Sequence, residues 1–267
     1  MEQKHVGIPE AMLIPLWARA VETKRAKPII VDRMALKILS RIDYDFSRFE
    51  KAWLSQVGVS IRTMLIDKAV RNFVRRKPGC IIINLGSGLD TRHDRLKTEA
   101  IDDWYDLDLP EAIGLRKSFF SEGRKNRFIA KSLFDTSWLL DMDTRDKPVL
   151  IIAEELLMHF HESQLRPLFA KLAVELPGAE MILEMREPFR VGKSRDHTAA
   201  RTIDTVPFPW GQKDSRELET WHENIRFIQE WNCFDYHRNR WKWFGLIGRL
   251  PLIRRKMRNR IVHLRFC

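Results

Sequence analysis

Cysteine is scarce in this sequence and long apolar runs are missing, and each absence excludes a class of protein. The three cysteines stand far apart and form no CxxC pair, so we expect neither a disulfide framework nor a bound metal. No segment approaches the roughly 18 consecutive apolar residues that a membrane span needs. The N-terminal patch AMLIPLW is short and flanked by charge, unlike an export signal. We therefore expect a cytoplasmic protein without a membrane span.

Internal repeats and low-complexity linkers are absent as well, which favours a single domain over residues 1–267. The hydrophobic content of 44% is enough for a sizeable core. Helical periodicity dominates residues 28–74, and KPG at 77–79 ends it. After that point short apolar runs alternate with segments long enough for a helix, which predicts a mostly parallel sheet of about seven strands covered on both faces. The expected strands are CIIINLG, WYDLDLP, NRFIAKSLFD, PVLIIAEE, GAEMILEM, WNCFDYH and RIVHLRFC.

Acidic residues are absent from one segment, residues 236–267, which holds ten of the 47 lysines and arginines. The rest of the chain is nearly neutral, although the net charge of the whole is +11. Trp241, Trp243 and Phe244 lie among these charges, a mixture that suits RNA, an anionic membrane surface or an acidic partner protein. A final helix and strand with a solvated cationic face explains the same pattern, and we favour it over nucleic-acid binding.

The stretch IIINLGSGLDTR places Gly86 and Gly88 directly after an expected strand. Glycines there allow a sharp turn and bring main-chain N–H groups close to a ligand. Thr91 stands where a dinucleotide fingerprint has its third glycine, so the motif alone is weak, and a purely structural turn remains an alternative.

Acidic residues lie at the ends of two further expected strands. Asp106 and Asp108 lie two apart in WYDLDLP, and Glu154 follows the run VLIIA. An acid about 20 residues beyond the glycines can accept hydrogen bonds from ribose hydroxyls, although two strand-end carboxylates could also simply cap the next helix. The phosphate loop GxxxxGK(S/T) is missing. An adenosine cofactor without phosphate fits these features, and S-adenosylmethionine is such a cofactor.

Several motifs, in this order and spacing, resemble the polyketide-synthesis (tetracenomycin-type) O-methyltransferase family, a relative of the leucine carboxyl methyltransferases. The resemblance implies an α/β, Rossmann-like class I methyltransferase fold that uses S-adenosylmethionine. It also implies an N-terminal helical cover over residues 1–76 and a core over residues 77–267. The motifs are NLGSGLDTR, WYDLDLPEAIGLRK, AKSLFDTSW, IIAEELLMHFHESQLRPLFAKLAVELPGAE, VSIRTMLID and PFPWGQKDSRELETWHENI.

The resemblance further implies a set of cofactor-binding residues, each at a position that matches a family motif. They are Arg62 for the cofactor carboxylate, Gly86 and Gly88 beside the methionine portion, Asp108 for the ribose, Ser132 and Leu133 around the adenine, Glu154 near the amino group, and Arg25 or its neighbour Lys24 in the cover. Arg62 could instead be an ordinary surface arginine of a helix.

Two residues depart from the family pattern after the fourth expected strand. Glu155 stands where relatives commonly have glycine, and His159 where they have tyrosine. Glu155 could alter substrate preference or simply face solvent. His159 and His161 are two apart, so at most one should reach the site, and His159 is our candidate general base.

These observations predict methyl transfer to a carboxylate or phenolic hydroxyl of a small aromatic or polyketide-like acceptor, which could be anionic or bound to a carrier protein. Two alternative methyl acceptors are a protein C-terminal carboxylate and RNA. A third alternative is that the chain is an inert cofactor-binding module that docks an acidic partner through its basic tail. Residues 189–211 are expected to form an insertion that covers the acceptor.

Overall fold

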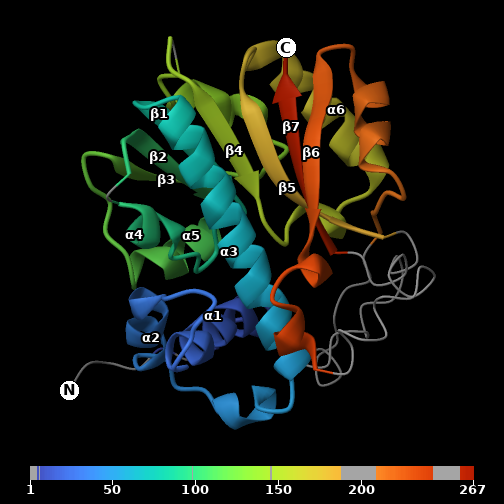
Figure 1. Ribbon diagram of the computed structural model, residues 1–267. Helices are drawn as coiled ribbons and strands as arrows, with labels where there is room; N and C mark the ends of the chain where they lie inside the picture. Colours follow the sequence, from blue (N-terminus) through green and yellow to red (C-terminus); the bar gives the residue numbers. More distant parts are fainter. Residues whose placement is uncertain (1–4, 6, 98, 145, 188–208, 243–258) are drawn as a thin grey trace.

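A seven-stranded sheet with strand order β3-β2-β1-β4-β5-β7-β6 forms the centre of the protein in the computed structural model (Figure 1). The structure describes residues 5, 7–97, 99–144, 146–187, 209–242 and 259–267. The strands are β1 (Cys80–Leu85), β2 (Ile101–Asp108), β3 (Asn126–Ala130), β4 (Val149–Ala153), β5 (Glu180–Arg186), β6 (Ile225–Asn232) and β7 (Asn259–Phe266). The helices are α1 (Glu10–Thr23), α2 (Arg33–Leu39), α3 (Trp53–Arg76), α4 (Arg92–Leu96), α5 (Pro110–Lys117) and α6 (Glu162–Glu175).

Strand direction confirms the expected mostly parallel sheet. The pairs β1–β2, β1–β4, β2–β3 and β4–β5 are parallel, whereas β7 runs antiparallel to both β5 and β6. The prediction of a strand over WNCFDYH was wrong. The strand before β7 is Ile225–Asn232, and the Asn232 side chain accepts a hydrogen bond from Phe234 N–H at 3.2 Å. This bond begins a short 3-10 turn, Cys233–Asp235, which ends the strand.

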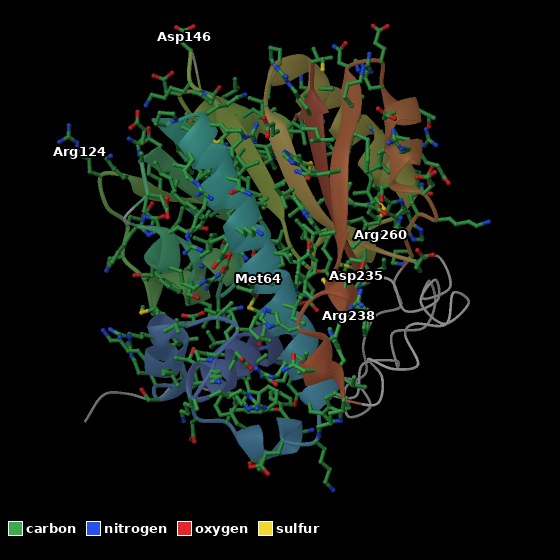
Figure 2. The ribbon with its side chains drawn as sticks, viewed as in Figure 1. Met64, Arg124, Asp146, Asp235, Arg238 and Arg260 are labelled. Atoms are coloured by element: carbon green, nitrogen blue, oxygen red, sulfur yellow. The ribbon has the colours of Figure 1, made fainter. Side chains whose placement is uncertain are left out.

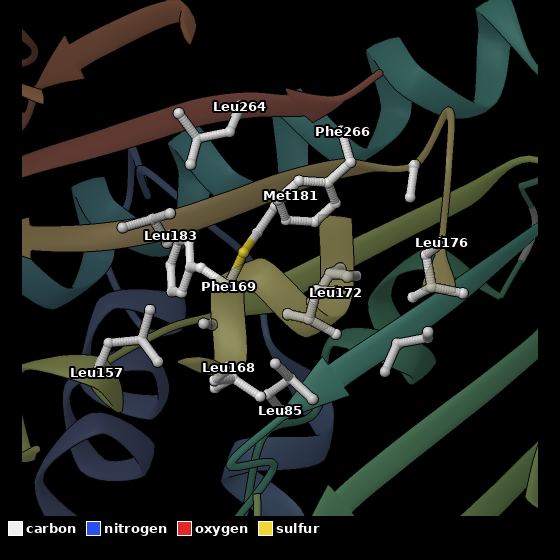
Figure 3. Packing of buried hydrophobic residues seen from close by; sticks show 14 of the residues in the cluster. Leu85, Leu157, Leu168, Phe169, Leu172, Leu176, Met181, Leu183, Leu264 and Phe266 are labelled. Carbon is white, nitrogen blue, oxygen red and sulfur yellow. The ribbon is translucent and has the colours of Figure 1, made fainter. Parts of the chain in front are cut away.

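Helices cover both faces of the sheet, so the central strands are buried on both sides. All six residues of β1 are buried, as expected for an apolar strand at the centre of a parallel sheet. The apolar side chains of α3 pack on one face. The other face is covered by α6, where Leu168, Phe169 and Leu172 pack against Met181 and Phe266 (Figure 3).

The N-terminal helices α1 and α2 lie at the end of the sheet where the parallel strands finish, beside the lower half of α3 in Figure 1. An ideal Cβ on Gly88, in the turn after β1, would lie 3.8 Å from Met12 of α1. Pro78 and Gly79 follow α3, and Gly79 has a φ of +73°, which breaks the helix where KPG predicted. The cover is thus placed against the carboxyl ends of the strands.

The described cations of the basic C-terminal segment divide between surface and interior: Arg238, Lys242 and Arg265 are exposed, as a solvated cationic face predicts. Trp241 and Arg260 are buried, and Arg240 forms an ion pair of 2.5 Å with the buried Glu22 of α1. Asp235 and Arg238 lie side by side at the surface (Figure 2). Residues 243–258, with Trp243 and Phe244, lie outside the described part of the chain, as does the expected insertion up to residue 208.

Among the described residues, no helix combines the length and apolar character needed to cross a membrane.

Candidate active site

The turn after β1 is formed by two glycines in the left-handed region of backbone conformation. Gly86 has a φ of +65° and Gly88 a φ of +41°. The N–H groups of Gly86 and Ser87 both donate to Leu107 O, which ties the turn to β2. A Cβ on Gly86 would lie 2.7 Å from Leu156 Cδ1, so even alanine would force that leucine to move. The sequence requires glycine here for both conformation and space.

The two acids of β2 have different environments. Asp106 is fully buried and forms an ion pair of 2.7 Å with Arg116 of α5, so it is a structural residue. Asp108, at the strand end, is only partly buried, and its two oxygens accept from the N–H groups of Gly88 at 2.7 Å and Leu109 at 2.8 Å. Desolvation by burial raises the pKa of Asp108 above its usual range. Each oxygen keeps a further lone pair, so Asp108 can accept from a ligand.

Arg62 of α3 has its guanidinium surrounded by carboxylates. Nε lies 2.6 Å from Glu154, Nη2 lies 2.6 Å from Glu155, and Nη1 lies 3.0 Å from Glu184. The arginine side chain is 3% exposed, so the possibility that Arg62 is an ordinary surface arginine is wrong. Arg62 is placed to bind carboxylates, and in this structure the chain supplies them.

Glu155 is held in the site by its neighbours. It faces Arg62, so the alternative that it simply faces solvent is wrong. Its φ of +50° lies in the left-handed region, which costs a residue with a Cβ about 1–2 kcal/mol. Its N–H donates to Glu184 Oε2 at 3.0 Å, which helps to hold this conformation.

Arg92 links three segments beneath the glycine turn. Its guanidinium is completely buried and contacts Asp67 of α3 at 2.8 Å, Asp90 at 2.5 Å and Glu154 at 2.5 Å. Burial alone would raise the pKa of Glu154, but Arg62 and Arg92 together hold that pKa well below its usual range. Glu154 is therefore a permanent anion beside the ends of β1 and β4.

The cover also contributes an arginine that was not among the predicted site residues. Arg19 of α1 is buried, donates to Leu89 O at 3.2 Å in the glycine turn, and pairs with Asp32 at 2.8 Å. Arg25 is 48% exposed and pairs with Glu22 at 3.3 Å. The contact of Arg25, or of its neighbour Lys24, with a cofactor stays a prediction, whereas the contact of Arg19 with the turn is present.

The segment after β3 carries the two residues expected around an adenine. Ser132 is partly buried, and its Oγ accepts from Phe134 N–H at 3.3 Å. Leu133 is buried, and its carbonyl accepts from Trp138 Nε1 at 3.1 Å. Phe134 stacks edge-on against Phe160 from the segment after β4, with ring centroids 4.8 Å apart. The fold thus brings two strand ends together around partly apolar surface, and adenine binding there stays a prediction.

The two histidines after β4 occupy different settings. His161 precedes α6, and its main-chain N–H donates to Gln164 Oε1 at 3.1 Å, so it begins the helix. His159 ends the short 3-10 turn Leu157–His159, four residues beyond Glu155, and its side chain is exposed. Desolvation by neighbouring atoms lowers its pKa and Arg186 adds to this, while the charges of Glu155 and Glu184 oppose it. In its neutral form His159 is able to accept a proton.

Three charged residues of this region were not among the predicted site residues. They are Arg19, Arg92 and Glu184, all buried. The available signal was a charge inside an apolar run: Glu184 interrupts GAEMILEM, and Arg19 interrupts LWARAV. A buried charge requires a partner, so such interruptions indicate a polar centre within the core.

The sequence of this chain is similar to those of known methyltransferases. A family model described as leucine carboxyl methyltransferase matches residues 12–173. The chain is 29% identical over 229 residues to the tetracenomycin polyketide synthesis O-methyltransferase TcmP of Streptomyces glaucescens, covering 86% of this chain and 84% of that protein. It is 27% identical over 243 residues to the S-adenosyl-L-methionine-dependent methyltransferase dpfgK of Gibberella zeae, covering 83% and 80% respectively.

Among solved structures, an S-adenosylmethionine dependent methyltransferase from Mesorhizobium loti superposes with a TM-score of 0.50 at 13% identity. The match covers 74% of this chain and 96% of that one. At this identity the likeness concerns the fold alone, and it agrees with the class I methyltransferase sheet.

Proposed function

This chain belongs to the leucine carboxyl methyltransferase family and is an S-adenosylmethionine-dependent methyltransferase, and we propose that it methylates an oxygen atom of a small aromatic or polyketide-like molecule. The acceptor oxygen belongs to a carboxylate or a phenol. The observation that carries the proposal is the placement of Asp108 beside the turn of Gly86 and Gly88, with Arg62 buried nearby among carboxylates. The oxygen acceptor is supported by the O-methyltransferase name of the Streptomyces glaucescens relative.

The residues present fit S-adenosylmethionine in three respects. Asp108 has lone pairs available for ribose hydroxyls. Gly86 itself carries no side chain, although Leu156 packs where its Cβ would lie. The buried Ser87 Oγ next to it has no hydrogen-bond partner within the described residues. Arg62 offers a guanidinium, which binds carboxylates in a bidentate manner.

We assign the cofactor contacts as follows. Arg62 binds the carboxylate of the amino-acid head, Glu154 attracts its ammonium group, and Asp108 binds the ribose. Gly86 and Gly88 border the methionine portion, and Ser132 and Leu133 border the adenine. Arg25, or its neighbour Lys24, touches the cofactor or the acceptor from the cover. Glu154 suits its role because Arg62 and Arg92 keep it ionised.

When bound, S-adenosylmethionine supplies a methyl group on a cationic sulfur, and the protein must position the acceptor oxygen and exclude water. An acceptor carboxylate, with a pKa near 4, is already ionised at pH 7, so it needs no base. A phenol, with a pKa near 10, gains from one. His159 is the proposed base for a phenol, since its lowered pKa keeps the imidazole neutral.

The test is transfer of a labelled methyl group from S-adenosylmethionine to a panel of aromatic acids and phenols, including carrier-bound forms. The product is then treated with mild alkali. A methyl ester releases labelled methanol and identifies a carboxylate acceptor, whereas an aryl methyl ether keeps its label and identifies a phenol. Label on the polypeptide chain itself or on RNA from a cell extract, or no labelled product at all, would contradict the proposal.

A further inference from the structure

The three carboxylates around Arg62 differ in how accessible they are. The Glu184 side chain is 0% exposed, Glu154 is 13% exposed, and Glu155 is 30% exposed. A ligand that approaches the guanidinium from solvent therefore meets Glu155 before the other two.

The carboxylates also differ in how firmly they are held. Glu154 has a second cation, Arg92, at 2.5 Å. Glu184 has Arg186 at 3.1 Å and also accepts the N–H of Glu155. Within the described part of the chain, the carboxylate of Glu155 contacts a single cation, Arg62. Glu155 is thus the carboxylate whose departure breaks the fewest contacts.

A fourth carboxylate cannot simply be added to this cluster. Arg62 already has an anion at each of its three nitrogen atoms, and a further anion would meet three like charges in a largely dehydrated place. An incoming carboxylate must therefore replace one of those present.

We propose that Glu155 is an internal competitor for the cofactor carboxylate: it occupies Nη2 of Arg62, must leave when the amino-acid head binds, and thereby lowers affinity for ligands that carry this head. The inference rests on the proposed role of Arg62 in cofactor binding. Glu155 is then a residue that sets cofactor affinity, and ligands without a carboxylate escape its effect.

Two ligands separate this effect from a general change in the site. S-adenosylhomocysteine carries the amino-acid head, and 5′-methylthioadenosine has the same nucleoside and sulfur without it. Titration calorimetry of both ligands should be done with the wild type, Glu155→Gln and Glu155→Gly. The glutamine variant keeps the side-chain shape and removes the charge, and the glycine variant suits the φ of +50° at this position. Glu175→Gln, in an exposed pair with Lys171 on α6, is the matched control.

Both Glu155 variants should bind S-adenosylhomocysteine about tenfold more tightly than the wild type, while their affinity for 5′-methylthioadenosine changes by less than about twofold. The control should match the wild type with both ligands. Equal or weaker binding of S-adenosylhomocysteine by folded Glu155 variants overturns the inference alone. Absence of binding by every protein overturns the proposed cofactor site, and this inference with it.

Discussion

The main-chain N–H of Gly88 donates to Oδ2 of Asp108 across 2.7 Å, and this bond joins the turn after β1 to the end of β2. One carboxylate thereby orders the glycine turn and still presents lone pairs to solvent. The turn and the acid come from neighbouring parallel strands, which explains why both lie at one edge of the sheet. Asp108 is therefore expected to shape the turn as well as to bind a ligand.

Replacement of Asp108 by alanine should weaken binding of S-adenosylhomocysteine by about 10- to 100-fold, because hydrogen bonds to a charged group contribute about 1.5–3 kcal/mol. Titration calorimetry measures the loss. Asp141→Ala removes an acid that is 40% exposed and pairs with Lys131, so it should bind like the wild type. Undiminished binding by Asp108→Ala would remove this residue from the cofactor site.

His159→Phe should lower turnover about 100-fold with a phenol acceptor and leave turnover with a carboxylate acceptor nearly unchanged. Because the pKa of His159 is lowered from 6.5, wild-type activity on a phenol should rise with pH through a midpoint below 6.5 and then level. His161→Phe is the matched control, since the helix-starting contact of His161 uses its main-chain N–H. Full activity of His159→Phe on a phenol would exclude the histidine as a base.

Arg92→Ala should reduce the free energy of unfolding by about 3–5 kcal/mol, because three carboxylates would lose a buried cation. Urea denaturation measures this change. Lys171→Ala, in an exposed pair with Glu175 within α6, should cost less than about 1 kcal/mol. Similar losses in the two variants would contradict the view that Arg92 joins α3 to the ends of β1 and β4.

Glu180 should make stability depend on pH in the acid range. Burial would raise its pKa, but hydrogen bonds from His263 and Arg76 lower it from 4.5 to about 2. A lowered pKa contributes stability above the unfolded value of 4.5, and this contribution is lost as pH falls toward 2. The contribution at neutral pH is on the order of 3 kcal/mol.

The wild type should therefore be more stable than Glu180→Gln at pH 7, and the difference should shrink steadily below pH 4.5. Urea denaturation at a series of pH values checks this, and Glu175→Gln should stay close to the wild type at every pH. A gap between the wild type and Glu180→Gln that is constant with pH would show that the ionisation of Glu180 is not linked to folding.

Charge counting was an incomplete guide to the C-terminal segment, in which Arg238, Lys242 and Arg265 are exposed but Arg240 and Arg260 are not. Ten basic residues without an acid suggested a cationic surface. The structure pairs Arg240 with Glu22, 218 residues earlier in the chain, and Arg260 is buried against Ser215 at 3.0 Å. A local count cannot see partners that the fold brings from elsewhere.

Local patterns were sufficient to predict the strands β1 to β5, the stop after α3, the glycine turn and the acid at the end of β2. Apolar runs, glycine conformation and strand ends depend on neighbours in the chain, so they can be read from short stretches. The position of β6 was missed, because the main-chain N–H of Phe234 donates to the Asn232 side chain and ends that strand earlier than its apolar residues suggested.

The environment of Arg62 was decided only by the tertiary structure. Its carboxylate partners Glu154, Glu155 and Glu184 lie 92, 93 and 122 residues away in the chain and meet it at the ends of β4 and β5. The family resemblance predicted that Arg62 binds a carboxylate, but it did not predict that the chain itself supplies three. Ion pairing in a buried site depends on distance and desolvation in space, and neither quantity is encoded in the spacing of residues along the sequence.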